Sequence, residues 1–217
     1  MAAPQVPRAL VDRAESLLDR SDRVVLGITG PPGSGKSTLT SALLSALGTR
    51  LGTDAVAHLP MDGFHLADVQ LDRLGLRDRK GAPETFDVDG YVAALARLHS
   101  SPASVLYVPG FERDLEQPLA GAIAIPPSAR LVVTEGNYLL LPDGGWEHVR
   151  PLLAEVWFVG VDDDVRRPRL IRRHVEFGKS PDAARAWLDH VDEPNARLVS
   201  SRRDAADLVV GAPPPGE

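Results

Sequence analysis

A run of eight residues has the composition and spacing of a phosphate-binding loop. Gly30–Ser37 reads Gly-Pro-Pro-Gly-Ser-Gly-Lys-Ser and fills every fixed position of the pattern G-x-x-x-x-G-K-[ST]. Because glycine has no side chain to obstruct the backbone, several main-chain N–H groups can surround one phosphate. In such a loop Lys36 reaches the β- and γ-phosphates, and the Ser37 hydroxyl ligates a magnesium ion. The run is therefore predicted to be a Walker A loop that binds a nucleotide; the alternative is a glycine-rich turn without a ligand.

The sequence on either side of this loop supports the prediction. Residues 24–29 form an apolar, β-branched run of strand length, and apolar residues recur at helical spacing over 36–47. The loop would then join a buried strand to a helix whose N-terminus attracts anions. The residues expected to bind the nucleotide are Gly30, Pro31, Pro32, Gly33, Ser34, Gly35, Lys36, Ser37 and Thr38.

Two acidic residues follow apolar strand-like runs. Asp62 comes directly after the run Val56–Met61, and Glu135 ends the run Leu131–Thr134. The carboxyl ends of parallel strands share one sheet edge, so both carboxylates are expected beside the Walker A loop. Phosphoryl transfer needs a carboxylate that accepts a proton from the nucleophile and another acid that supports magnesium. Asp62 and Glu135 fit these roles; the alternative is that each is a turn residue before a glycine.

Arginines are concentrated in one expected helix, at 164–177. Arg166, Arg169 and Arg173 fall at i, i+3 and i+7 and would share one face. Guanidinium groups neutralise charge that is spread over several phosphate oxygens, so this segment, at about 162–180, is predicted to form a small lid over the transferring phosphate. The alternative is a solvated helix face whose acidic start and basic end match the helix dipole.

The elements that position these residues are predicted to form an α/β fold, a parallel sheet with helices on both faces. Strands are expected at 24–29, 55–60, 104–108, 130–134 and 155–161, alternating with helices at 36–47, 89–99, 164–177 and 181–191. A helix at 8–20 and shorter strands at 122–125 and 207–210 complete the prediction. Residues 62–90 are expected to form a polar loop that carries the acceptor site, and the Pro/Gly-rich tail at 211–217 to be disordered.

Length and composition limit the class of protein. A chain of 217 residues is expected to form a single domain, 1–217. The net charge of −6 gives no general attraction for nucleic acid, and no apolar stretch is long enough to indicate a membrane partner. Without cysteine there are no disulfides and no thiolate metal sites. These features predict a cytoplasmic protein without a nucleic-acid or membrane partner, and the polar segment at 62–90 favours a small-molecule substrate.

Several motifs together resemble the P-loop kinases of the uridine kinase, phosphoribulokinase and pantothenate kinase group. The resemblance covers residues 24 to about 199 and rests on the Walker A loop, Met61–His65, Gly81–Asp87, Glu135–Tyr138 and Arg169–His174. More narrowly, Val108–Arg113, residues 135–140 and Asp192–Ala196 resemble the nucleoside/nucleotide kinase-like branch, whose members are often labelled only as kinases or as fructose-transport kinases.

The resemblance implies roles for individual residues. Asp62 would be the catalytic base, Lys36, Arg169 and Arg173 would bind the phosphates, and Ser37 and Glu135 would hold Mg²⁺. The residues implied to surround the acceptor are Asp62, His65, Phe86, Asp87, Phe111, Arg113, Asn137 and Tyr138, and Asn195 would lie near the adenine. His65 stands where uridine kinases have a tyrosine, so it either contacts a different substrate or caps a loop.

These roles imply an ATP-dependent phosphotransferase with an alcohol group as acceptor. Nucleoside-like, pantothenate-like and sugar acceptors all stay open, because specificity depends on pocket shape rather than on these motifs. The preference for ATP over GTP and a possible homodimer come from the resemblance alone. A rival from another class is a nucleotide-dependent ATPase or switch that acts through a protein partner, and a third reading is a relative that only binds nucleotides.

Overall fold

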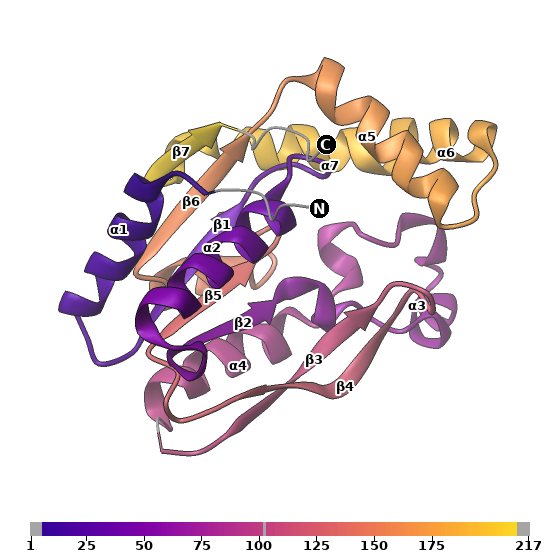
Figure 1. Ribbon diagram of the computed structural model, residues 1–217. Coiled ribbons are helices and arrows are strands. Elements are labelled where there is room, and N and C mark those ends of the chain that lie inside the picture. The colour runs from indigo at the N-terminus through magenta and orange to yellow at the C-terminus, as the bar shows by residue number, and fades with distance from the viewer. Residues whose placement is uncertain (1–5, 102, 212–217) are drawn as a thin grey trace.

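The computed structural model describes residues 6–101 and 103–211 (Figure 1). The expected disordered tail therefore lies outside the described residues, apart from Gly211, which ends a strand. Figure 1 shows the N-terminal helices in front of a central sheet and an arm of helices, formed by the C-terminal third of the chain, above it.

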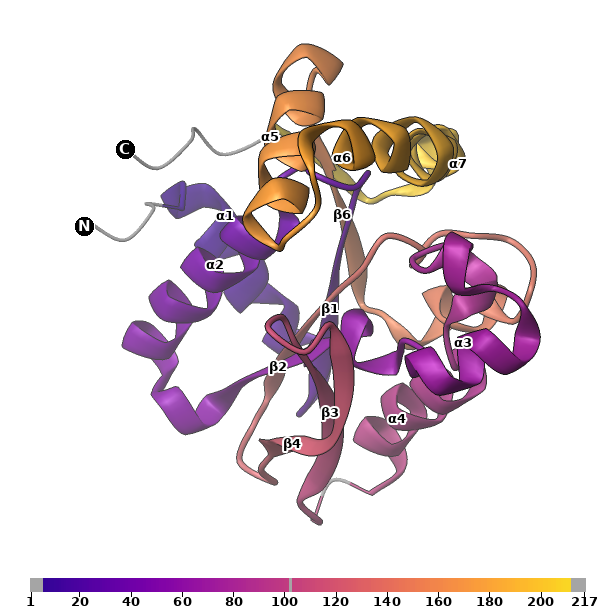
Figure 2. The same cartoon turned by 90° about the vertical axis from the view of Figure 1, so that its right-hand side faces the viewer.

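Two layers of helices cover the sheet, one on each face. In Figure 2 the sheet is seen nearly edge-on, with α1 (Arg8–Ser16) and α2 (Lys36–Leu51) on one side and α4 (Val88–Ser100) on the other. The apolar faces of α1 and α2 pack on Leu26 and Trp157, and that of α4 belongs to the core on the opposite face. Among the described residues, no helix is both long and apolar enough to cross a membrane.

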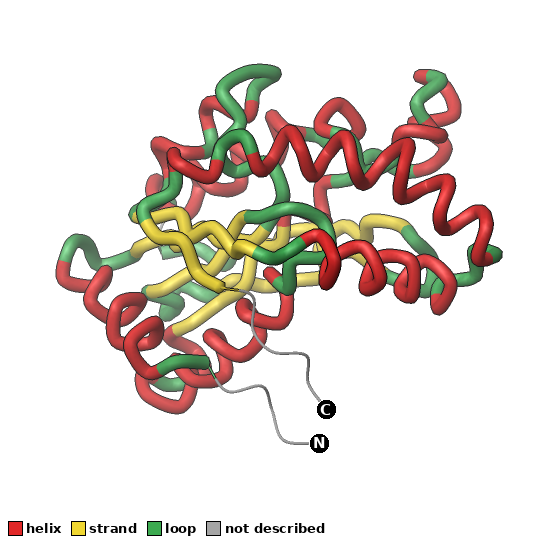
Figure 3. Tube along the Cα trace, turned by 90° about the horizontal axis from the view of Figure 1, so that it is seen from above, coloured by secondary structure: helices red, strands yellow, loops and turns green. Residues whose placement is uncertain are grey.

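The central sheet has five strands and is entirely parallel, as predicted. Figure 3 shows its strands in yellow with helices in red on both sides. Its strand order is β2-β5-β1-β6-β7, so the strand before the Walker A loop lies in the middle. All six residues of that strand are buried, which explains its continuous apolar sequence. The strands are β1 (Val24–Thr29), β2 (Val56–Pro60), β5 (Leu131–Glu135), β6 (Glu155–Gly160) and β7 (Leu208–Gly211).

The strand expected at 104–108 does not join this sheet, so that part of the prediction is wrong. It forms β3 (Leu106–Glu112), which pairs antiparallel with β4 (Gln117–Ile125) in a separate two-stranded sheet. The ladder is irregular between Val108 and Gly110, where Pro109 has no N–H to donate. The short strand expected at 122–125 is the end of β4, and the hairpin brings β3 against the turn that follows β2.

Short helices replace the long loop expected at 62–90. That region contains the turn Met61–Phe64, α3 (Asp68–Leu74) and further single turns before α4. At the other end of the chain, α5 (Asp163–Glu176) and α6 (Pro181–Trp187) lead through a π-helical turn, Leu188–Asp192, into α7 (Glu193–Ser200). In Figures 1 and 2 these helices lie above the sheet, and α3 flanks it on the side of α4.

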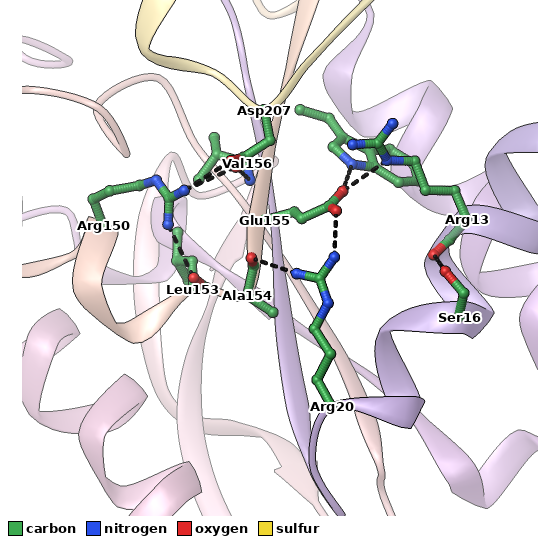
Figure 4. Close-up of polar contacts among 10 residues, drawn as sticks. Arg13, Ser16, Arg20, Arg150, Leu153, Ala154, Glu155, Val156 and Asp207 are labelled. Atoms are coloured by element: carbon green, nitrogen blue, oxygen red, sulfur yellow. Dashed lines mark hydrogen bonds and ion pairs between the residues drawn. The ribbon is translucent and has the colours of Figure 1, made fainter.

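An ion-pair network anchors the start of β6, at the edge of the sheet where the parallel strands begin (Figure 4). The Glu155 carboxylate, only 5% exposed, accepts hydrogen bonds from Arg13 (2.8 Å), Arg20 (2.9 Å) and the indole of Trp157 (2.9 Å). Burial alone would raise the pKa of Glu155, but these donors hold that pKa below its usual value. The network ties the N-terminal helical segment to the sheet.

Candidate active site

The Walker A loop leaves β1 at the carboxyl edge of the sheet and leads into α2, which begins at Lys36. Gly33 and Gly35 have φ of +78° and +92°, a backbone conformation that favours glycine. Because these turns aim the loop back over the start of α2, the positive end of the helix dipole faces the space above the sheet. The predicted connection of strand, loop and helix is therefore present.

Lys36 lies across the mouth of this loop. Its Nζ donates hydrogen bonds to the carbonyls of Gly30 (2.9 Å) and Pro31 (3.0 Å), which hold the ammonium group beside the loop. Burial lowers the pKa of Lys36 to about 8, although the carboxylates of Glu135 and Asp62 favour its charged form. A phosphate group here would add negative charge and stabilise the protonated lysine.

Asp62 lies in the turn immediately after β2, on the same edge. Burial disfavours its charged form, yet His65, Arg113 and Lys36 hold the pKa of Asp62 below its usual value. The carboxylate is therefore ionised near neutral pH and able to accept a proton. Gly63 follows because a β-carbon there would collide with the carbonyl of Pro109 on β3, so the Asp-Gly pair serves close packing of the hairpin.

Glu135 ends β5 beside the first turn of α2. The Ser37 hydroxyl donates a hydrogen bond of 3.1 Å to its carboxylate, so the two predicted metal ligands are neighbours. Magnesium in nucleotide sites is bound by few protein oxygens together with phosphates and water, and this hydroxyl and carboxylate fit that requirement. Burial and the charge of Asp62 raise the pKa of Glu135, although Lys36 and Ser37 oppose the shift.

The buried polar groups behind Glu135 are also paired. The hydroxyl of Thr134 donates to the carbonyl of Leu59 on β2 (2.6 Å), and the Tyr91 hydroxyl on α4 lies 2.6 Å from the same threonine oxygen. Because Thr134 uses its proton toward Leu59, Tyr91 is the donor in the second contact. These contacts join β2, β5 and α4 directly beneath the two acidic residues.

A cavity of about 610 Å³ opens above these residues, within the usual range for small-molecule sites. It brings together the Walker A loop, both acids and most of the predicted acceptor contacts. The predicted site residues that line it are Pro32, Gly33, Lys36, Ser37, Asp62, His65, Phe86, Phe111, Arg113, Glu135, Asn137, Arg173 and Asn195.

His65 caps a turn, which is one of its two predicted roles, and it also lines the cavity; its contact with a substrate stays a prediction. Its Nδ1 lies 2.8 Å from the carbonyl of Asp62, which can only accept, so Nδ1 carries the proton. Burial lowers the pKa of His65, which leaves Nε2 as an acceptor for a substrate hydroxyl. The ring centroids of Phe86 and Phe111 lie 4.0 Å and 5.0 Å from that of the imidazole, so this end of the cavity has aromatic walls.

Some residues predicted for the acceptor or nucleotide lie elsewhere. The Asp87 carboxylate caps α4 by accepting from Gly90 (2.9 Å), and Tyr138 is fully buried with its hydroxyl on the carbonyl of Gly81. Asn195 lines the cavity and also donates to Gly81 (3.2 Å). The residues that do not line the cavity are Gly30, Pro31, Ser34, Gly35, Thr38, Asp87, Tyr138 and Arg169.

The shared arginine face predicted for the lid does not form as expected. Arg166 is 1% exposed and pairs with Glu193 of α7 (2.5 Å) and with Asp163 (2.8 Å), whereas Arg173 lines the cavity. Residues at i and i+7 share a face, but the first turns of α5 pack against the Walker A loop and only its later turns overhang the cavity. Arg166 is therefore held in buried ion pairs and does not line the cavity.

Sequence reasoning missed the cavity residues Lys80 and Lys179, and it missed His58, which lies beside Glu135 without lining the cavity. The chain has only three lysines, Lys36, Lys80 and Lys179, and all three line the cavity, so their rarity was an available signal. His58 on β2 points its Nε2 toward Glu135 at 3.9 Å, and burial lowers the pKa of this histidine to about 4. Nothing in the local sequence distinguishes His58 from a structural strand residue.

Comparison with known proteins finds similar proteins that are named as kinases. No family model matches the chain. It is 33% identical over 207 residues to a Schizosaccharomyces pombe protein named "Putative uridine kinase", covering 93% of this chain and 88% of that protein. It is 37% identical over 161 residues to the Aspergillus versicolor "ATP-dependent kinase-like protein notR'", covering 70% and 94% of the two chains.

A solved structure of a fructose transport system kinase from Silicibacter sp. TM1040, described there as putative, superimposes with a TM-score of 0.82 at 35% identity, covering 93% of this chain and 98% of that one. Its similarity extends over the sheet, the hairpin and the C-terminal helices together, because so little of either chain is left out. The chain therefore belongs to the P-loop kinases of the uridine kinase and phosphoribulokinase group.

Proposed function

We propose that the protein transfers the γ-phosphoryl group of ATP to a hydroxyl group of a small polar metabolite. The observation that carries this proposal is the position of Asp62, between the Walker A loop and the aromatic end of one cavity. A carboxylate placed there lies between the γ-phosphate and an acceptor bound against His65 and Phe111. The relatives named as kinases support the same reaction class.

The proposed reaction is an in-line displacement. The acceptor hydroxyl gives its proton to Asp62 as its oxygen forms a bond to the γ-phosphorus, and the bond from that phosphorus to the β–γ bridging oxygen breaks to release ADP. Lys36 and Arg173 stabilise charge on the phosphate oxygens. Mg²⁺, held by Ser37 and Glu135, would neutralise further charge between the β- and γ-phosphates. Arg169 stays a predicted phosphate ligand.

Acceptors of three kinds fit a cavity of this size: nucleosides, pantothenate-like compounds and sugars. A nucleotide switch that acts through a protein partner is the competing function. It would need the γ-phosphate to be cleaved by water, whereas the aromatic and polar wall formed by His65, Phe86 and Phe111 is suited to a bound organic acceptor. The cytoplasmic location and the homodimer stay predictions from the sequence.

The experiment that tests the proposal measures ADP release from ATP and Mg²⁺ against a panel of nucleosides, pantothenate, fructose and ribose. The expected result is that one class of acceptor stimulates ADP release and accumulates as a phosphorylated product. Lys36→Ala serves as the inactive control because it loses the phosphate-binding ammonium group. Slow ADP release that no acceptor changes would contradict the kinase and favour the switch.

A further inference from the structure

Asp62 and Arg113 form an ion pair at the centre of the cavity. Arg113 Nη2 donates to Asp62 Oδ2 at 2.8 Å, although the two residues lie 51 positions apart. Arg113 comes from the turn between β3 and β4 and lines the same cavity as the Walker A loop. One oxygen of the proposed catalytic base is therefore engaged by an arginine that belongs to the acceptor side.

The surroundings of Arg113 hold it in place without neutralising it fully. Its guanidinium lies over the ring of Phe111, 5.0 Å from the centroid, and Lys80 lies 5.7 Å from the same centroid. Lys80 is itself fixed by the Asp68 carboxylate (2.7 Å) and by the carbonyl of Glu116. Arg113 is 44% exposed, and the hydrogen bond to Asp62 uses one of its five N–H donors. The remaining donors are available to a ligand in the cavity.

The pair has a consequence for catalysis. A carboxylate that is hydrogen-bonded to a guanidinium is a weaker proton acceptor than a free one, because the positive charge favours the ionised form. A neutral acceptor has no group that competes for Arg113. An acceptor with its own anionic group can bind the available donors of the guanidinium and then compete with Asp62 Oδ2 for its charge; arginine suits such a group because its fork matches carboxylate and phosphate oxygens.

We propose that the phosphate acceptor carries a carboxylate or phosphate group, which binds Arg113 and releases Asp62 to accept the proton of the reacting hydroxyl. This inference rests on the proposed function, since it takes Asp62 as the base. The interaction is local, because Asp78 and Glu116 also line the cavity and would repel an anion placed near them. Recognition therefore belongs to Arg113, with Lys80 beside the same Phe111 ring.

The proposal separates the three acceptor kinds. Hydroxy acids, pantothenate-like compounds and sugar phosphates carry the required charge, whereas nucleosides and free sugars do not. Arg113 would thus decide between acceptors through charge, and the aromatic rings around it would decide through shape.

The test uses three probes with the same carbon skeleton: glycerol, which is neutral, glycerate, which carries a carboxylate, and glycerol 3-phosphate, which carries a phosphate. Each probe is titrated at millimolar concentration into protein loaded with Mg²⁺ and a non-hydrolysable ATP analogue, and its affinity is measured from the shift in thermal unfolding. The variants are Arg113→Gln, which loses the charge, and Arg113→Lys, which keeps it. Arg79→Gln is the matched control, because Arg79 pairs with Glu84 and does not line the cavity.

The expected result is that one or both anionic probes bind the wild-type protein more tightly than glycerol does. The affinity of that probe should fall roughly 10- to 100-fold in Arg113→Gln, less in Arg113→Lys and not at all in Arg79→Gln, as for a charge-assisted hydrogen bond. A phosphate ligand and a carboxylate ligand are told apart by which probe responds.

The proposal is overturned if neither anion binds better than glycerol, or if Arg113→Gln binds the anion as tightly as the wild type. Thermal unfolding without probe shows whether each variant is folded, so a loss of binding is not confused with unfolding. The binding readout needs no turnover. Anion binding that depends on Arg113, combined with no acceptor-stimulated ADP release, would contradict the proposed kinase reaction and leave this site standing.

Discussion

Leu170 of α5 packs directly against Gly33 of the Walker A loop: a β-carbon built on Gly33 would lie 2.8 Å from Leu170 Cγ. Position 33 is one of the variable positions of the Walker A pattern, so the pattern does not explain this glycine. The contact with Leu170 and the φ of +78° explain why position 33 is a glycine. The helix α5, which was predicted to be a lid, therefore packs against the nucleotide-binding loop and supports it.

Gly33→Ala is expected to destabilise the protein through both effects. The left-handed backbone conformation costs about 1–2 kcal/mol for alanine, and the contact with Leu170 adds about 1–3 kcal/mol. The matched control is Gly75→Ala, because Gly75 has φ +66° and open space around its β-carbon position, so only the first cost applies. Denaturant unfolding and nucleotide affinity are the measurements. Equal losses for the two variants would show that the Leu170 contact contributes nothing.

The buried pair of Arg166 and Glu193 is expected to hold α5 against α7. Glu193→Gln leaves the buried Arg166 guanidinium with Asp163 as its charged partner, so the loss should be a part of the roughly 3–5 kcal/mol that breaking a buried pair costs. Asp182→Asn, which disturbs the exposed pair with Arg185, should cost less than about 1 kcal/mol. Chemical denaturation compares the two variants, and a small loss for Glu193→Gln would remove the anchoring role of Arg166.

Ser37→Ala is expected to uncouple nucleotide binding from magnesium. The variant loses one of the two protein oxygens that fit the ion, so the gain in ATP affinity on adding Mg²⁺ should shrink by at least about 10-fold. Ser37→Thr keeps the hydroxyl and should retain the gain. Titration of ATP with and without Mg²⁺ measures the effect, and an unchanged magnesium dependence in Ser37→Ala would exclude Ser37 as a ligand.

Glu155→Gln tests the network at the other edge of the sheet. Replacing a buried carboxylate that accepts three hydrogen bonds should lower the free energy of unfolding at pH 7 by about 1–3 kcal/mol. Because the pKa of Glu155 is lowered in the folded protein, its stabilising effect is complete above the unfolded pKa of about 4.3 and is lost as the pH falls through the folded pKa. The difference in the free energy of unfolding between the wild type and Glu155→Gln should therefore shrink only below about pH 4.5.

The control for that experiment is Glu147→Gln, whose carboxylate is exposed. It should change the free energy of unfolding by less than about 0.5 kcal/mol both at pH 7 and at pH 3. A difference between wild type and Glu155→Gln that stays constant down to pH 3 would show that the carboxylate charge does not contribute.

The sequence was sufficient for the parallel sheet and insufficient for the hairpin. Strands buried on both faces have continuous apolar sequence, so residues 24–29 and 130–134 were recognisable without knowing their neighbours. The run Leu106–Val108 is also apolar throughout, yet Tyr107 is exposed and only one face of β3 is buried. Pro109, which cannot donate to a sheet on that side, was the signal that this strand lies outside the central sheet.

Residues fixed by the backbone pattern were predicted well, and those fixed by tertiary contacts were not. Asp62 and Glu135 follow strand ends, and the strand ends alone place them beside the Walker A loop. Arg166 and Arg173 share a helix face by periodicity, but the packing of that helix decides that the first is buried and the second lines the cavity. Lys80 is positioned by α3 and the hairpin turn, which no local pattern reveals.

The most direct test of the account measures phosphoryl transfer from ATP to the acceptor that stimulates ADP release, in a single turnover, for the wild type and for Asp62→Asn. The account predicts that transfer falls roughly 10²- to 10⁴-fold, the usual contribution of a general base, while ATP affinity stays within about threefold. Glu147→Gln, whose exposed carboxylate does not line the cavity, should transfer at nearly the wild-type rate. Transfer by Asp62→Asn at a rate close to the wild type would contradict the account.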